Sequence, residues 1–232
     1  MRLLKLLLVI TRAALAPPVR TDLASRCEWQ QEVAKRMLAA LGVEVITKGN
    51  FPESGLLVSN HLSYLDVVAL ASLGSAVFVS KSDVMKWPLI GTLLRHSGTI
   101  LTHRNEPLKA ATTASEIRAA LDAPLPVALF PEGTSSDGSL VLPFRTTLFQ
   151  PAHDAAVSIT PARILYTSAT GNPAEDIAYH SDHSFFPHLA KLSRLKDVQA
   201  HIAFGNPQPP RENRKRSAVH FHAEVTQLEP PS

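Results

Sequence analysis

Two residues capable of acid–base chemistry lie close together in the segment Val58-Ser-Asn-His-Leu-Ser-Tyr-Leu-Asp66. His61 and Asp66 are five positions apart, and on a regular helix their side chains would diverge by about 140° and could not touch. A turn at His61, with Ser63 capping the helix that follows, instead lets the Asp66 carboxylate fold back onto the imidazole. This contact would fix the ring tautomer and leave the other ring nitrogen free as a general base, with the nucleophile supplied by the substrate.

A second polar turn supports a catalytic interpretation, because the pair alone is explained more simply as a hydrogen-bonded turn. An apolar run leads into His61, as a buried strand would. A similar run, residues 127–130, leads into a turn that carries Glu132, Gly133 and Thr134. Both polar turns therefore follow predicted strands.

Strand-like and helix-like segments alternate along the chain. Strands are predicted at residues 43–47, 56–59, 76–79, 98–102, 127–130, 157–159 and 164–166. Helices are predicted at residues 22–41, 66–73, 87–94 and 107–121. This alternation predicts an α/β fold, a single layered domain with a mostly parallel sheet flanked by helices, whose ligands lie beyond the carboxyl ends of the strands. His61, Arg104 and Glu132 each follow a predicted strand, so we expect them to converge at that edge.

Three segments, in order, resemble the motifs of the phospholipid/glycerol acyltransferases, a family whose type member acylates lysophosphatidic acid. They are Asn60-His61 to Asp66, which contains a His-x4-Asp motif, then Gly98 to Arg104, then Phe130-Pro-Glu-Gly-Thr134. A weaker fourth block ends in Pro161, and the resemblance covers roughly residues 40–205. It implies a membrane-associated enzyme of phospholipid biosynthesis that moves a fatty acyl group from acyl-CoA or acyl carrier protein to the hydroxyl of a lysophospholipid.

The expected catalytic step follows from the two polar turns. His61 would take the proton of the lysolipid hydroxyl as the oxygen attacks the thioester carbonyl, and Asp66 would orient His61. Amides of the turn around Gly133 would stabilise the oxyanion. The leaving thiol, with a pKa of about 8.5, departs readily, so neither an acyl-enzyme nor a metal is required. No cofactor is expected beyond the thioester co-substrate.

Cationic side chains are expected to bind an anionic head group of the acceptor. Arg104 is the first candidate because its planar guanidinium matches such a group, and Lys81 would assist it. The resemblance further assigns acceptor binding to Glu132, Gly133 and Thr134.

The sequence departs from the usual family pattern at Ser135, because the family commonly has arginine directly after the Pro-Glu-Gly-Thr run. One phosphate-binding charge is therefore missing, although Arg145 could compensate for it. Residues 135–145 and 179–189 look like the branch that includes lyso-ornithine lipid acyltransferases, whose acceptor carries no phosphate. We expect 1-acyl-sn-glycerol-3-phosphate as the acceptor, as the common activity of the family, with lyso-ornithine lipid as the alternative.

The first residues combine leucines with isolated cations. At 100° per residue, Arg2, Lys5 and Arg12 fall within about 80° of arc, and leucines occupy most of the rest. This pattern predicts a monotopic interfacial helix, with a short tilted span, a signal peptide or a core helix as alternatives. The expected units are a membrane-associated helical segment 1–42, an acyltransferase domain 43–206 and a C-terminal extension 207–232.

Composition and charge indicate the cellular setting. The 232 residues suffice for one well-buried domain, and the single cysteine, Cys27, excludes an internal disulfide and fits a reducing compartment. Basic residues gather in segments 1–21 and 211–216, without the interleaved aromatic residues that binding of single-stranded nucleic acid would require. We therefore expect membrane lipids rather than nucleic acid as partners, and a peripheral or monotopic position on the cytoplasmic face of the inner membrane.

Other classes of protein fit less well. Histidines at positions 180, 183 and 188 suggest a metal site, but no His-Glu-x-x-His or Cys-x-x-Cys motif accompanies them, so we expect no metal. A serine hydrolase would carry Gly-x-Ser-x-Gly, which the sequence lacks. A catalytically silent lipid-binding module of the same fold stays open, although the spacing of His61 and Asp66 argues against it.

Overall fold

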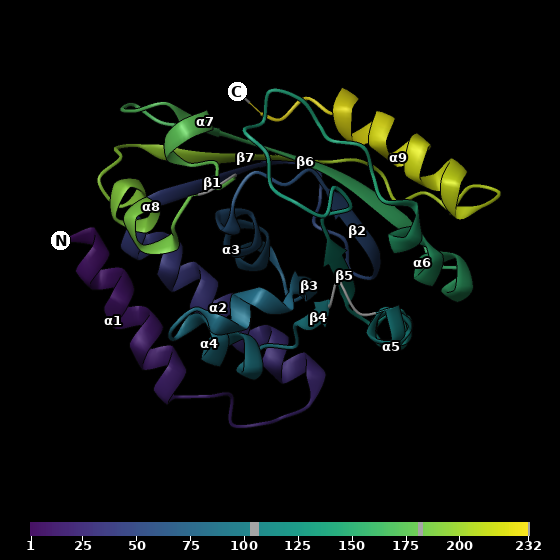
Figure 1. The fold of residues 1–232 in the computed structure, drawn as a ribbon, viewed down its shortest axis with the longest axis horizontal. Coiled ribbons are helices and arrows are strands. Elements are labelled where there is room, and N and C mark those ends of the chain that lie inside the picture. The colour runs from purple at the N-terminus through teal and green to yellow at the C-terminus, as the bar shows by residue number, and fades with distance from the viewer. Residues whose placement is uncertain (103–106, 181–182, 232) are drawn as a thin grey trace.

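A seven-stranded sheet organises the part of the chain that the computed structural model describes, residues 1–102, 107–180 and 183–231 (Figure 1). Its spatial order is β1-β7-β6-β2-β5-β3-β4. The strands are β1 (Val43–Lys48), β2 (Gly55–Ser59), β3 (Val77–Lys81), β4 (Ile100–Thr102), β5 (Pro126–Leu129), β6 (Ile159–Thr167) and β7 (Val198–Phe204).

Five neighbouring strands, from β6 to β4 in the spatial order, run parallel. Strand β7 is antiparallel to β6, and β1 runs parallel to β7. Every residue of β2 and β5 is buried, because helices cover both faces of a parallel sheet and a central strand must be apolar on both sides. The predicted α/β domain with a mostly parallel sheet is therefore confirmed.

Helices form a layer on each face of the sheet. They are α1 (Arg2–Leu15), α2 (Leu23–Leu41), α3 (Tyr64–Leu73), α4 (Ile90–His96), α5 (Pro107–Ala120), α6 (Gln150–Ala155), α7 (Pro173–Asp176), α8 (Phe185–Leu192) and α9 (Arg214–Gln227). Short 3-10 turns add η1 (Ser82–Lys86) and η2 (Thr146–Phe149). Helices α1, α2, α3 and α8 share one apolar core, and α5, α6 and α9 share the other.

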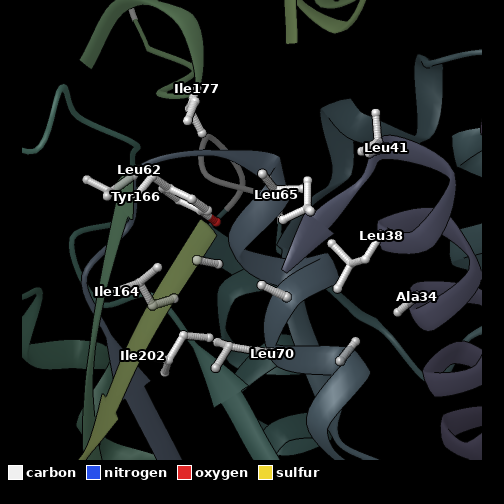
Figure 2. Close-up of a cluster of buried hydrophobic side chains, with 14 of the residues drawn as sticks. Ala34, Leu38, Leu41, Leu62, Leu65, Leu70, Ile164, Tyr166, Ile177 and Ile202 are labelled. Carbon is white, nitrogen blue, oxygen red and sulfur yellow. The ribbon is translucent and has the colours of Figure 1, made fainter. Parts of the chain in front are cut away.

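The alternation of side chains along β2 shows how the sheet serves both cores. Leu57 belongs to the core under α1, α2 and α3, whereas Leu56 and Val58 belong to the core under α5, α6 and α9. Figure 2 shows part of the first core, where Leu38 of α2, Leu70 of α3 and side chains of β6 and β7 meet.

Several boundaries differ from those expected. The strands predicted at 157–159 and 164–166 are one strand, β6, which continues through Pro161 because this proline needs no amide there and its carbonyl accepts the Gly205 N–H at 2.8 Å. The helix predicted at 87–94 begins at Ile90, after Leu89 adopts a left-handed φ of 65°. Strand β7 and helices α6 to α9 were not predicted.

The two ends of the chain pack onto the central domain. Leu6, Ile10 and Ala13 of α1 are buried in the first core, and Phe221 and Val225 of α9 are buried in the second. The segments expected as separate units therefore contribute to the same cores as the sheet, and their functional division stays a prediction. Among the helices of the described residues, none has the length and apolar character needed to cross a bilayer.

Candidate active site

The segment after β2 brings His61 and Asp66 into contact. Asn60 fixes the end of the strand, since its side chain accepts the Ile164 N–H at 2.8 Å and donates to the Ile164 carbonyl at 2.9 Å. Ser63 then takes the extended N-cap position of α3, which places Asp66 in the first turn of the helix. His61 Nδ1 lies 2.8 Å from Asp66 Oδ2, as predicted from the sequence.

Asp66 is fully buried, and the surrounding structure supplies its hydrogen-bond donors. Its Oδ2 accepts the amides of Leu62 at 2.7 Å and Ser63 at 2.9 Å, in addition to the His61 contact. Its Oδ1 accepts the hydroxyl of Tyr166, on β6, at 2.8 Å. Burial, followed by the neighbouring Asp66 charge, raises the pKa of Tyr166 well above its ordinary value, so this hydroxyl stays a donor. Charge-assisted hydrogen bonds of this kind hold a buried carboxylate in one orientation.

The imidazole of His61 is partly exposed, whereas the carboxylate of Asp66 is not. Its side chain is 21% exposed, against 0% for Asp66, and the ring stacks on Phe130 with centroids 4.1 Å apart. When Nδ1–H donates a hydrogen bond to Asp66, the lone pair on Nε2 remains available to take a proton from a substrate. The geometry is that of an oriented general base.

Glu132 joins the second polar turn to the first. Strands β2 and β5 pair in parallel, with Val58 opposite Leu129, so the residues after their ends are neighbours. Glu132 Oε1 accepts the His61 N–H at 3.0 Å. Burial raises the pKa of Glu132 to about 7, against the lowering effect of its hydrogen bond from the His61 amide. The predicted convergence of His61 and Glu132 is confirmed.

Gly133 lies where a larger residue would not fit. Its φ is 69°, and an added Cβ would lie 2.5 Å from Nε of Arg145, whose side chain crosses the turn. The Gly133 amide donates to the Phe130 carbonyl at 3.0 Å, so this amide closes the turn and does not point to a substrate oxyanion. Thr134 is exposed beside it.

Ser135, at the position where the family commonly has arginine, makes a contact within the protein. Its hydroxyl donates to the Tyr179 carbonyl. The Tyr179 amide in turn donates to the Leu62 carbonyl at 2.7 Å. Ser135 therefore anchors the segment around Tyr179 against the loop that carries His61.

A cavity of about 790 Å³ opens beside the imidazole. It extends along the carboxyl ends of the parallel strands, and His61, Lys81, Gly133 and Arg145 all line it. Most of its wall is apolar and comes from both helical layers, including Ile10, Val33, Met37, Leu93 and Ile117. Such a space suits a substrate with a long hydrocarbon chain. Arg104, the predicted head-group residue, lies outside the described residues.

An aromatic cluster forms another part of the cavity wall. Tyr64 makes edge contacts with Trp87, Tyr179 and Phe185, and all four line the cavity. The Tyr64 hydroxyl hydrogen-bonds to His188 Nδ1 at 2.9 Å, and His188 Nε2 contacts the Ala178 carbonyl at 3.0 Å. Both ring nitrogens of His188 therefore make hydrogen-bond contacts within the protein. Across the described part of the chain, no group of three or more His, Cys, Asp or Glu residues is arranged to hold a metal.

The residues that sequence reasoning missed come from distant parts of the chain. Tyr166 contacts Asp66 across 100 positions, and Tyr64 contacts His188 across 124. The segment 179–189 had two signals in the sequence, its likeness to one branch of the acyltransferases and the histidines that suggest a metal site.

Comparison with known proteins places these features in a family. The family model described as Acyltransferase matches residues 42–165. The chain is 35% identical, over 187 residues, to a lyso-ornithine lipid O-acyltransferase of Brucella abortus, covering 74% of this chain and 70% of that protein. It is 32% identical, over 148 residues, to a 1-acyl-sn-glycerol-3-phosphate acyltransferase of Neisseria meningitidis, covering 60% of this chain and 56% of that protein.

A solved structure has the same fold. The 1-acyl-sn-glycerophosphate acyltransferase of Thermotoga maritima superposes with a TM-score of 0.65 over 98% of this chain and 95% of that one, at 18% identity. The curated relatives are longer, and the matched regions span 56% to 70% of the two named above.

Proposed function

Because this chain belongs to the acyltransferase family, we propose that it transfers a fatty acyl group from an acyl thioester to the hydroxyl of a lysolipid, in the synthesis of membrane lipids. The observation that carries the proposal is the His61–Asp66 pair, with the carboxylate fully buried and the imidazole opening onto a long, mostly apolar cavity. A silent binding module would need these hydrogen bonds only for the stability of the buried carboxylate, and it would not need an oriented imidazole at the cavity.

The chemical step needs only groups that this site and the two substrates supply. The lysolipid hydroxyl attacks the thioester carbonyl while His61 Nε2 takes its proton, and Asp66 stabilises the imidazolium that forms. The tetrahedral intermediate then expels the thiolate, which recovers the proton from His61. The products are an ester and a free thiol, and no acyl-enzyme is formed.

Two acceptors fit this scheme. For 1-acyl-sn-glycerol-3-phosphate, the common acceptor of the family, the exposed Arg145 beside Gly133 offers a cation at the cavity for the phosphate. A separate observation favours lyso-ornithine lipid: Ser135, in place of the usual arginine, uses its hydroxyl to hold the Tyr179 carbonyl. Relatives of both names support the pair of candidates.

Helix α1 is suited to binding the surface of a bilayer. Leu4, Leu8 and Leu15 are 73%, 48% and 80% exposed, and at 100° per residue they fall within about 40° of arc. Exposed Lys5 and Arg12 lie next to this face, both on the same side of it, while the opposite side of the helix is buried. We propose that this leucine face inserts into the head-group region of the cytoplasmic leaflet, with the two cations near anionic lipids.

Acyl transfer from a labelled thioester tests the proposal. Wild type and His61→Ala are compared with lysophosphatidate and with lyso-ornithine lipid as acceptors, in detergent and on vesicles. Product formed from either acceptor by the wild type and lost in His61→Ala supports the function and identifies the acceptor. Vesicle binding by a wild type that transfers to neither acceptor would refute it in favour of the silent module.

A further inference from the structure

The cavity crosses the sheet edge from one helical layer to the other. On one side its wall includes Leu6 and Ile10 of α1, and on the other it includes Gln150 of α6 and Arg214 of α9. Helix α1 belongs to one apolar core of the molecule, and α6 and α9 to the other. Figure 1 shows α1 and α9 at opposite sides of the molecule, with α3 between them.

The two ends of the cavity differ in chemistry. At the α1 end the helix carries an exposed leucine face, which suits a bilayer and hence an acceptor that resides in one. At the α9 end stands the basic segment 211–216. All six of its residues are described, and of them Arg214 alone lines the cavity.

Contacts within the α9 end distinguish Arg214 from its neighbours. Arg211 donates to Gln208, and Arg216 lies 3.9 Å from Glu212. Arg214 Nη1 lies 3.5 Å from Gln150 Oε1, across the wall of the cavity, and its side chain is exposed. The guanidinium is therefore placed where a ligand in the cavity can reach it.

Of the two substrates, the donor is the one that must bring a phosphate to the cavity. A pantetheine arm carries a phosphate in coenzyme A and in acyl carrier protein alike, whereas lyso-ornithine lipid has none. The donor is also water-soluble, so it approaches from the side away from the bilayer. We propose that Arg214 binds the phosphate of the pantetheine arm of the acyl donor at the α9 end of the cavity, an inference that rests on the proposed acyl transfer.

A donor series that differs only in the phosphate tests this assignment. Four donors that carry the same acyl chain are compared at a saturating concentration of acceptor. They are acyl-CoA, the acyl thioester of acyl carrier protein, acyl-4′-phosphopantetheine and acyl-pantetheine. Removing Arg214 by Arg214→Ala should raise KM about tenfold for the three phosphorylated donors, the effect of a charge-assisted hydrogen bond at an exposed site. KM for acyl-pantetheine and for the acceptor should not change.

The matched control is Arg216→Ala, on the same helix and 75% exposed, which removes a similar charge away from the cavity. An equal rise in KM for this variant would show a general effect of charge and overturn the proposal. So would a rise for acyl-pantetheine, or for the acceptor, in Arg214→Ala. Among the phosphorylated donors, an effect confined to acyl-CoA would assign Arg214 to the nucleotide phosphates instead and contradict the pantetheine assignment.

A direct binding measurement separates this inference from the function it rests on. Calorimetry with 4′-phosphopantetheine should show binding to the wild type, about tenfold weaker binding to Arg214→Ala, and unchanged binding to Arg216→Ala. If the wild type transfers acyl groups but all three proteins bind equally, only the role of Arg214 is refuted. If the wild type transfers from no donor, the proposed function itself fails, and the inference with it.

Discussion

Tyr166 should support catalysis without touching the substrate. Its hydroxyl donates to Asp66 Oδ1 at 2.8 Å, in a region where Asp66 is fully buried. In Tyr166→Phe that buried oxygen loses the hydroxyl that donates to it. A hydrogen bond to a charged group contributes about 1.5–3 kcal/mol, so the free energy of unfolding should fall by about 2 kcal/mol. For a chain of this size, Tm should fall by roughly 4–8 °C.

The kinetic effect should be smaller than that of removing the carboxylate. Asp66 would keep its bonds to His61, Leu62 and Ser63, and these still define the orientation of the imidazole. We therefore expect kcat to fall roughly tenfold in Tyr166→Phe, because the carboxylate gains freedom to rotate. KM for both substrates should stay unchanged, since Tyr166 does not line the cavity.

Steady-state kinetics and thermal unfolding of the same preparations check this prediction. Ile202→Val is the control, because Ile202 is fully buried in the same core (Figure 2) but lies on β7 and is not among the residues that hydrogen-bond to Asp66, and its loss of a methyl group costs about 1 kcal/mol. It should lower Tm and leave kcat unchanged. An unaltered kcat in Tyr166→Phe, or a change confined to KM, would show that Tyr166 only contributes packing.

Three further substitutions follow from the site and from α1. Asp66→Asn should lower kcat on the order of 10⁴-fold, measured by acyl transfer, because the amide favours the wrong tautomer of His61; activity within tenfold of wild type would contradict the general-base role. Burial raises the pKa of Glu132 from 4.5 to about 7, so between these pH values the unfolded chain releases the proton that the folded chain keeps. The wild type therefore loses stability as pH rises through this window, and Glu132→Gln should not show this loss. In urea unfolding, the stability of Glu132→Gln relative to wild type should therefore increase by up to about 3 kcal/mol between pH 4.5 and pH 7 and stay constant above; an equal difference at pH 5 and pH 8 would refute this. Leu8→Glu should weaken binding to anionic vesicles at least tenfold in sedimentation assays without lowering Tm, because Leu8 is 48% exposed; unchanged binding would exclude the leucine face from the membrane contact.

The parts of the site that the sequence predicts are those that depend on local geometry or on strand direction. The contact of His61 with Asp66 needs only a strand end, a helix cap and five positions of spacing, all contained in one short segment. The meeting of His61 and Glu132 follows from parallel strands, because their carboxyl ends lie at one edge. Neither prediction required the order of the strands in the sheet.

The parts that escaped prediction depend on strand order and register. Tyr166 reaches Asp66 only because β6 lies beside β2 and runs unbroken through Pro161, where two short strands were predicted instead. The insertion of β7 between β1 and β6 is equally invisible to local periodicity. The oxyanion role expected for the Gly133 turn fails for the Gly133 amide, because that amide closes the turn itself.

The position of Asp66 links the stability of the fold to catalysis. A buried carboxylate without donors would be costly, and here the donors come from the His61 loop and from β6, so the carboxylate is stable only when α3 and β6 are correctly docked. The N-terminus of α3 adds favourable partial charge at the same point. Changes that alter how α3 and β6 meet at Asp66 should therefore lower kcat through the orientation of His61, even where they touch neither substrate. Tyr166 is the side chain through which this coupling is most direct.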